Sequence, residues 1–395
     1  MLRQQQLTKW LESQFPNETF TISPASADAS FRRYFRATFA DGNGNTLPAK
    51  SLIVMDAPPQ HENCRPFLHV AKLFEKAGTH VPHVYAQDLQ QGFLLLSDLG
   101  NTTYLQALSA STARDLYGAA TDALIKIQLA SRENELPPYD EALLLREMRL
   151  FPEWYIAKHL NVTLTDKQHA KLEEVFARII TNNLAQPRVY VHRDYHSRNL
   201  MYIERPLLNP LPEMPSPQSS PASERGGERE RQSLIPAGEE ANEKRGKQAI
   251  READARKSNF LTSPGILDFQ DALYGPITYD LVSLFKDAYI KWEEAEIIDW
   301  LIRYWEKARK AGLPVAEDFS GFYRDYEWMG VQRHLKVLGI FARLYHRDSK
   351  DGYLKDLPLV MAYLRAACAR YIDLKPLLNL LDELEPHGIQ EGYTF

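Results

Sequence analysis

Two short stretches of this sequence decide its fold: His-Arg-Asp-Tyr-His-Ser-Arg-Asn at 192–199 and Ile-Leu-Asp-Phe-Gln-Asp at 266–271. Each begins at or just after a brief apolar run and then turns polar, which is typical of a short strand that leads into a site. The first stretch matches H-R-D-x-x-x-x-N, in which the Asp accepts or orients the proton of an attacking hydroxyl and the Asn binds magnesium. The second places a carboxylate directly after a strand, where phosphoryl transfer needs a ligand for phosphate-bound magnesium.

These patterns assign roles to individual side chains. Asp194 is the candidate base, and Asn199 and Asp268 are the candidate magnesium ligands, because phosphoryl transfer asks mainly for positioning and charge neutralisation. His192 is expected to organise the catalytic loop rather than carry a proton, since Asp194 already fills that role. Asp280, at the head of a predicted helix, is either an N-terminal helix charge or a hydrogen-bonding support for the loop.

Composition excludes several classes of protein. The chain has 395 residues, 44% hydrophobic and 25% charged, which fits a globular protein of two to three units at roughly 150 residues each. Lys and Arg total 47 against 52 Asp and Glu, so the net charge of -5 gives no reason to expect nucleic acid as a partner. Two cysteines without CxxC spacing support neither a disulfide framework nor a zinc site. With no membrane-length apolar run and no signal-peptide core, we expect a cytoplasmic protein.

The hydrophobic pattern changes near residue 100. Apolar and β-branched residues predict strands at 20–22, 31–39, 51–55 and 92–97, with a helix at 65–77 between the last two. From residue 103 the spacing becomes helical. The runs with this spacing are 113–129, 141–160, 166–184, 279–311 and 319–384. We therefore expect an α+β fold with a small, mostly antiparallel lobe at 1–100 and a larger, mainly helical lobe at 101–395.

A segment from about 204 to 263 interrupts the second lobe. It is rich in Pro, Ser and charged residues and almost lacks large apolar ones, so it is predicted to be a disordered insertion. Its charges are mixed in sign, which favours a solvated loop over a specific docking element. With this segment looped out, Asp194 and Asp268 are separated only by a short β-hairpin.

Three further stretches carry a resemblance to a known family. They are Ala-Ser-Phe-Arg-Arg-Tyr-Phe-Arg at 29–36, Val-Met-Asp-Ala-Pro-Pro at 54–59 and Ile-Leu-Asp-Phe-Gln-Asp-Ala at 266–272. Together with the 192–199 motif, they make the sequence similar to the aminoglycoside phosphotransferase and choline kinase superfamily, which has a two-lobed protein-kinase-like fold. The absence of an A-P-E segment separates it from true protein kinases. Within the superfamily, it resembles the bacterial kinases of cell-wall amino sugars.

The resemblance implies an activity and its cofactors. Such kinases use ATP and Mg²⁺ to phosphorylate N-acetylmuramate and N-acetylglucosamine at the anomeric hydroxyl. The sugar 1-phosphates enter peptidoglycan recycling, so a sugar-1-phosphate uridylyltransferase is the implied pathway partner. The anomeric hydroxyl is more acidic than an ordinary alcohol, which makes it easier for Asp194 to activate.

The resemblance also implies a nucleotide site, with two departures from the family pattern. Ser97, Asp98 and Leu99 fall in a hinge near 96–100 whose backbone would hold the adenine. No glycine-rich loop is present, and the nearest match is the small-residue turn at 26–36, whose backbone amides, including that of Ser30, would cover phosphates. The second departure is Met55, which stands about where the family has a phosphate-binding lysine. The candidate replacement cations are Arg32, Arg33 and Arg36, although each is also a plausible solvated strand residue.

The acceptor pocket is the least specified part. An N-acetylmuramate carboxylate would suit an arginine, and a sugar ring needs polar partners and an apolar floor. The candidate substrate-binding residues are His196, Arg198, Arg146, Arg149, Gln270, Asp271 and Arg333. The candidates in helical segments, Arg146, Arg149 and Arg333, are also consistent with a helix-face or core position, and Arg198 with a loop-stabilising salt bridge.

Other functions compete with this reading. An aminoglycoside kinase would have a carboxylate-lined pocket. A choline-type kinase would have an aromatic cage, for which Trp154, Tyr155, Trp305 and Trp328 are available. An inactive nucleotide-binding scaffold would agree with the missing glycine loop and lysine, but it need not retain Asp194 together with the two magnesium ligands.

Overall fold

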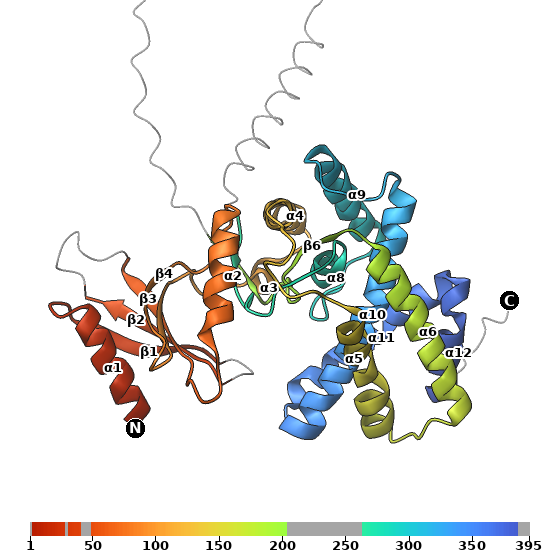
Figure 1. Cartoon of the computed structure of the whole chain (residues 1–395), viewed down its shortest axis with the longest axis horizontal. Coiled ribbons are helices and arrows are strands. Elements are labelled where there is room, and N and C mark those ends of the chain that lie inside the picture. Colours follow the sequence, from red (N-terminus) through yellow and green to blue (C-terminus); the bar gives the residue numbers. More distant parts are fainter. Residues whose placement is uncertain (1, 28–30, 41–48, 204–262, 386–395) are drawn as a thin grey trace, which may run out of the picture. The chain divides into compact units, whose positions relative to one another are not determined.

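A computed structural model describes residues 2–27, 31–40, 49–203 and 263–385 of the chain. An antiparallel sheet forms the N-terminal part and helices form most of the rest, which confirms the predicted α+β class (Figure 1). The division near residue 100 stays a prediction, because the described residues on both sides of it belong to one compact unit. The predicted insertion, except Ser263, lies outside the described residues, as does Ser30.

The N-terminal sheet has five antiparallel strands in the order β1-β2-β3-β5-β4. Their bounds are β1 (Phe20–Ala27), β2 (Arg33–Phe39), β3 (Ser51–Asp56), β4 (Val84–Asp88) and β5 (Phe93–Ser97). The sequence did not predict β4, because its side chains alternate between half-buried and exposed at the sheet edge and give a weak apolar signal. Strand β1 also runs further than predicted, through a register shift between Pro24 and Ser26.

Two helices accompany this sheet. Helix α1 (Leu2–Gln14) buries Leu7, Trp10 and Leu11 in one cluster with residues of β2, β3 and β5. Helix α2 (Cys64–Lys76) begins where the Asn63 side chain accepts a hydrogen bond from the Arg65 N–H, a standard N-cap arrangement. Its apolar face carries Phe67 and Phe74, whose rings lie 4.9 and 5.9 Å from the Phe269 ring. Helix α2 is thereby packed against the second of the two stretches that decide the fold.

The rest of the described chain is mainly helical. Its helices are α3 (Tyr104–Ala107), α4 (Ala113–Leu129), α5 (Glu141–Leu150), the π-helix η1 (Phe151–His159), α6 (Asp166–Ala185), α8 (Tyr279–Phe285), α9 (Glu294–Lys310), α10 (Phe319–Asp348), the 3₁₀-helix η2 (Asp351–Asp356), α11 (Leu357–Arg370), the 3₁₀-helix η3 (Ile372–Leu374) and α12 (Lys375–Leu384). Helix α10 packs against α5, η1, α6, α8, α9 and α11. Contact on several sides explains why its middle section is buried all round.

Two small strand pairs carry the predicted motifs. Strand β6 (Arg188–Val191) pairs with β9 (Leu273–Pro276), and β7 (Leu200–Met201) pairs with β8 (Gly265–Ile266). The loop between β6 and β7 therefore lies beside the loop between β8 and β9. The β7–β8 pairing is the short hairpin predicted for the ends of the insertion. Nothing in the described part of the chain forms a helix long and apolar enough to cross a membrane.

The prediction of continuous helical spacing over 279–311 is wrong, because the structure has a break between two helices there. Helix α8 ends at Phe285, and the next helix starts only at Glu294. The carboxylate of Asp287 accepts hydrogen bonds from the backbone N–H groups of Tyr289 and Ser197 instead of continuing the helix. Polar contacts to another loop therefore override the helical periodicity.

A close contact between α10 and the junction of α5 with η1 generates a stability prediction. A Cβ atom at Gly339 would overlap the backbone carbonyl group and the Cβ of Leu150. We expect Gly339→Ala to lower the free energy of unfolding by roughly 1–3 kcal/mol, as overpacking does. The matched control is Gly330→Ala on the same helix, where the nearest atom, of His334, is 3.6 Å away. Urea denaturation of both variants measures the difference, and equal stabilities would contradict the prediction.

Candidate active site

Two buried carboxylates hold the loop between β6 and β7. The Asp280 side chain accepts hydrogen bonds from the backbone N–H of His192 (2.7 Å) and of Arg193 (3.0 Å). The Asp287 side chain accepts them from the backbone N–H (2.9 Å) and the hydroxyl (2.5 Å) of Ser197. Both acids come from α8 or the turn after it, so one segment fixes both ends of the loop. Asp280 lies in the first turn of α8, and its two bonds support the predicted role as a prop.

His192 is placed as an internal brace. Its ring is fully buried, with Nε2 2.9 Å from the Leu267 carbonyl oxygen and Nδ1 3.2 Å from the backbone nitrogen of Asp194. The ring therefore donates through Nε2 and accepts through Nδ1, which is the neutral tautomer. Burial lowers the pKa of His192 to about 4. This geometry supports an organising role and not proton transfer at neutral pH.

The two candidate magnesium ligands lie side by side. The Asn199 amide donates to the Asp194 backbone oxygen (3.0 Å) and to Asp268 Oδ2 (3.4 Å), and Gln270 donates to Asp268 Oδ1 (2.7 Å). Asp268 has φ 60° and Arg193 has φ 78°, conformations that non-glycine residues rarely adopt. Such strain persists only where the surrounding structure fixes it, and it is concentrated at functional sites.

The donor set fits a nucleotide-bound magnesium ion. One carboxylate and one amide oxygen suit Mg²⁺, which takes its remaining ligands from phosphates and water. No group of three or more His, Cys, Asp or Glu side chains arranged to hold a metal occurs among the described residues.

Cations surround the Asp194 carboxylate. Arg333 Nη1 lies 3.8 Å from Asp194 Oδ1 and donates to the Arg193 backbone oxygen at 3.0 Å. Lys336, one turn further along α10, donates to the Tyr279 hydroxyl at 3.0 Å. Burial alone would raise the pKa of Asp194, but the charges of Lys336 and Arg333 outweigh it and hold this pKa well below its usual range. Asp194 is therefore ionised at neutral pH.

Glu147 neutralises these cations. Its carboxylate is bound by Arg193 and the Tyr139 hydroxyl, and it lies 3.1 Å from Lys336 Nζ and 3.2 Å from Gln332 Nε2. Sequence reasoning gave no role in the site to Glu147, Lys336, Tyr279 or Asp287. One signal was available: Glu147 falls on the same helix face as the apolar Leu144 and Met148.

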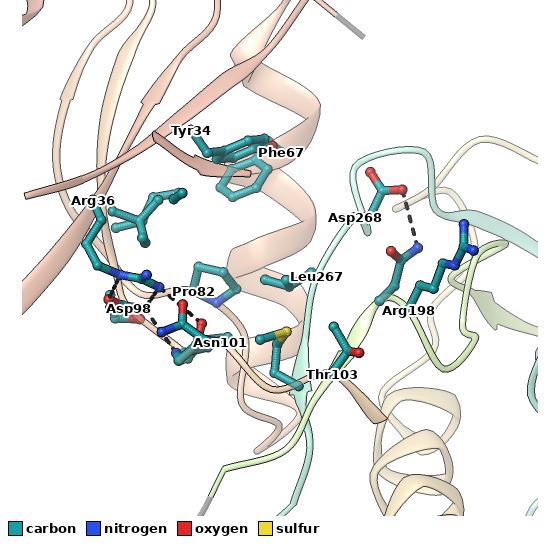
Figure 2. Close-up of a pocket in the computed structure, with 18 residues that line it drawn as sticks. Tyr34, Arg36, Phe67, Pro82, Asp98, Asn101, Thr103, Arg198, Leu267 and Asp268 are labelled. Atoms are coloured by element: carbon teal, nitrogen blue, oxygen red, sulfur yellow. Dashed lines mark hydrogen bonds and ion pairs between the residues drawn. The ribbon is translucent and has the colours of Figure 1, made fainter. Parts of the chain in front are cut away.

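A cavity of about 350 Å³ opens between the N-terminal sheet and these loops. The residues predicted for the hinge, Ser97, Asp98 and Leu99, line it. Figure 2 shows Arg36 and Asp98 at one end of the cavity and Asp268 and Arg198 at the other. Among the described residues, no backbone hydrogen-bond partner engages the main chain of Asp98 or Leu99. This edge therefore presents main-chain donors and acceptors to a ligand.

The three candidate replacement cations lie in different places. Arg36 lines the cavity and binds Asp98 with both Nε (2.5 Å) and Nη2 (3.0 Å). Arg33 is paired with the fully buried Asp56. Arg32 forms an ion pair with Glu62 at 3.0 Å. Burial would lower the pKa of Arg32, but nearby groups that include Glu62 and Asp268 raise it overall. Met55, at the position of the expected lysine, is completely buried.

The predicted substrate-binding residues divide into two groups. Gln270 contacts Asp268, Arg333 contacts Asp194, and His196 and Arg198 both contact Tyr289. Arg146 and Arg149 are exposed and are not brought into this cluster, and the side chain of Asp271 is exposed although its backbone oxygen lies 3.5 Å from Arg193 Nη1. Arg149 instead forms an ion pair with Glu173 at 3.0 Å. Helical geometry explains this, because Arg146 and Arg149 lie on the opposite face of α5 from the buried Leu144.

The fold and this site define a phosphotransferase with a kinase-like architecture. The family model described as the phosphotransferase enzyme family matches residues 21–207 and 253–319, so the chain belongs to that family. The chain is 44% identical to an N-acetylmuramate/N-acetylglucosamine kinase of Neisseria meningitidis serogroup B, with 100% of both chains covered. It is 42% identical to the protein of the same name from Pseudomonas putida, with 97% of each covered.

Solved structures confirm the fold. An ADP-bound aminoglycoside phosphotransferase aligns with a TM-score of 0.52 at 13% identity, covering 91% of this chain and 97% of the other. A choline/ethanolamine kinase family protein from Mesorhizobium loti also gives 0.52, at 12% identity, covering 96% and 99%. The resemblance to this superfamily, inferred from the motifs, is confirmed.

The charge around Asp194 predicts a pH effect. Lys336→Met removes a charge that holds the pKa of Asp194 down, so this pKa rises. With Asp194 as the candidate base, we expect the acid limb of the kcat/KM profile to move to higher pH, because a base acts in its ionised form. The control is Lys286→Met, which removes another buried lysine, 3.5 Å from Glu327. Identical acid limbs in the two variants would contradict the prediction.

Proposed function

We propose that this phosphotransferase is an ATP- and Mg²⁺-dependent kinase that phosphorylates the anomeric hydroxyl of N-acetylmuramate and N-acetylglucosamine. The observation that carries the chemistry is that Asn199, which lines the cavity with Asp268, donates both to Asp268 and to the backbone oxygen of Asp194. The names of the full-length relatives at 42–44% identity support the choice of substrates.

The cavity suits the nucleotide. Its edge at Asp98 and Leu99 offers main-chain groups to the adenine, and Ile53, Leu96 and Met201 give the ring an apolar environment. The phosphates would then extend toward Asp268. Magnesium, when bound by Asp268 and Asn199, would neutralise charge on the phosphates as the phosphoryl group transfers.

Asp194 activates the hydroxyl group that accepts the phosphoryl group. Its carboxylate orients the anomeric hydroxyl and accepts the proton as the oxygen attacks phosphorus. A carboxylate with a lowered pKa is a weak base, which suits an anomeric hydroxyl because this group is more acidic than other sugar hydroxyls. Arg333, next to Asp194, keeps the carboxylate charged and fixed in place.

The product places the enzyme in a sequence of reactions. A sugar 1-phosphate is the substrate that a nucleotidyl transfer consumes, so a sugar-1-phosphate uridylyltransferase is the proposed pathway partner in peptidoglycan recycling. The cytoplasm, where ATP is available, is the proposed location.

A turnover assay tests the substrate. Purified protein with ATP and Mg²⁺ is incubated with N-acetylmuramate, N-acetylglucosamine, kanamycin or choline, and the product is examined by phosphorus NMR. We expect an anomeric 1-phosphate from both amino sugars. Turnover of kanamycin or choline alone would retain the phosphotransferase chemistry but reject the sugar.

Two variants test the assigned residues. Asp194→Asn should lower kcat by about 10²–10⁴-fold, the usual contribution of a general base, while nucleotide binding persists. Asp268→Asn should also weaken nucleotide binding in the presence of magnesium, measured by calorimetry with and without the metal. Near-normal turnover by Asp194→Asn would refute the assignment of the base.

A further inference from the structure

Arg198 is distinguished by its setting in the catalytic loop. Its guanidinium group lies 3.5 Å from the centroid of the Tyr289 ring, and its side chain lines the cavity. In Figure 2 this group points away from the Arg36–Asp98 end of the cavity. Among the described residues, no carboxylate lies within ion-pair distance of it. The predicted alternative, a loop-stabilising salt bridge, is therefore not formed within this part of the chain.

The other arginines near the site have partners. Arg193 is bound to Glu147. Arg333 donates to the Arg193 backbone oxygen and the Tyr279 hydroxyl. Arg36 holds Asp98. Because a guanidinium presents a planar fork of donors that matches a carboxylate, Arg198 is the cation best placed to bind an acidic ligand group.

Aromatic residues continue from Arg198. The Tyr289 ring lies 5.4 Å from the His196 ring and 6.3 Å from Phe341, which in turn lies 5.1 Å from Tyr353 of η2. Such a run offers the apolar face that a sugar ring packs against. His196 connects this run to the catalytic loop, because its backbone N–H donates to the Asp194 carbonyl oxygen at 3.0 Å.

A buried polar group lies in the same 3₁₀-helix as Tyr353. Asp356, at the end of η2, has a buried Oδ2 atom with no hydrogen-bond partner among the described residues. Burial raises the pKa of this carboxyl group, and Arg198 is one of the charges that oppose the rise. A buried acceptor without a partner costs free energy, which a ligand hydroxyl or amide N–H would recover.

We propose that Arg198, stacked on the Tyr289 ring, binds the carboxylate of an acidic amino sugar, with Asp356 as a hydrogen-bond acceptor. This inference rests on the proposed function. The lactyl group of N-acetylmuramate carries a carboxylate that N-acetylglucosamine lacks, so Arg198 determines the preference between the two sugars. It supplies binding and takes no part in proton transfer.

The test compares two sugars in one enzyme. kcat and KM are measured with N-acetylmuramate and N-acetylglucosamine for the unmodified protein, Arg198→Met and Arg198→Lys. We expect Arg198→Met to lower kcat/KM for N-acetylmuramate, mainly through KM, by about 10- to 100-fold more than it lowers kcat/KM for N-acetylglucosamine. Arg198→Lys should restore part of the preference, because the charge remains but the planar fork is lost.

A neutral analogue makes the test independent of how well the variant folds. The methyl ester of the lactyl carboxylate keeps the shape of N-acetylmuramate and removes its charge. The unmodified enzyme should have a higher kcat/KM for the acid than for the ester, by the factor that separates the unmodified protein from Arg198→Met with the acid. Arg198→Met should have the same kcat/KM for the acid and the ester. Arg303→Met, which removes an arginine paired with Asp299 on the exposed side of α9, serves as the control and should behave as the unmodified protein.

The outcomes separate the two proposals. Equal losses for both sugars, or an enzyme that does not distinguish acid from ester, would overturn the role of Arg198 and leave the kinase assignment intact. No turnover of either sugar by the unmodified protein would instead overturn the proposed function.

Discussion

The structure depends on keeping the Asp194 carboxylate charged in a half-buried position. Burial favours the neutral acid, so the fold must bring positive charge close to it. Lys336 and Arg333 of α10 provide that charge, and they are themselves buried and need partners. Glu147 of α5 and the Tyr279 hydroxyl of α8 are those partners. Removing one member leaves a buried charge unpaired, which costs several kcal/mol, so the three helices and the loop form one interdependent unit.

The same constraint explains why the loop is held at both ends. A carboxylate used for positioning must keep its place to within a fraction of an ångström. Asp280 and Asp287 bind the backbone of the loop from the α8 segment, and His192 ties it to Leu267 in the neighbouring loop. The regular helix α8 ends at Phe285 because the Asp287 side chain accepts a hydrogen bond from the Ser197 hydroxyl. The strained backbone of Arg193 and Asp268 is consistent with this rigid support.

The N-terminal sheet follows a related principle with its arginines. Arg33 joins Arg3 of α1 at the buried Asp56, which links the first helix to β2 and β3. Arg36 joins Asp98 at the hinge end of β5. Arg33 and Arg36 are three residues apart on β2, so the alternation of side chains directs them to opposite faces of the sheet, where each meets a different carboxylate.

The sequence by itself determined the fold class and most of the strands and helices, and it singled out Asp194, Asn199 and Asp268, which the structure brings together. These features depend on local spacing: a short strand followed by Asp194 or Asp268 is visible along the chain. It did not reveal β4, because an edge strand is only half buried and its apolar pattern is weak. Arg146 and Arg149 were predicted to bind substrate because arginine suits a carboxylate. Only the folded helix shows that Glu147, which lies between them in sequence, is on the buried face. Tertiary structure alone brought Lys336, Glu147 and Asp287 to the loop, because they are distant in sequence and their role is defined by partners that no local pattern records.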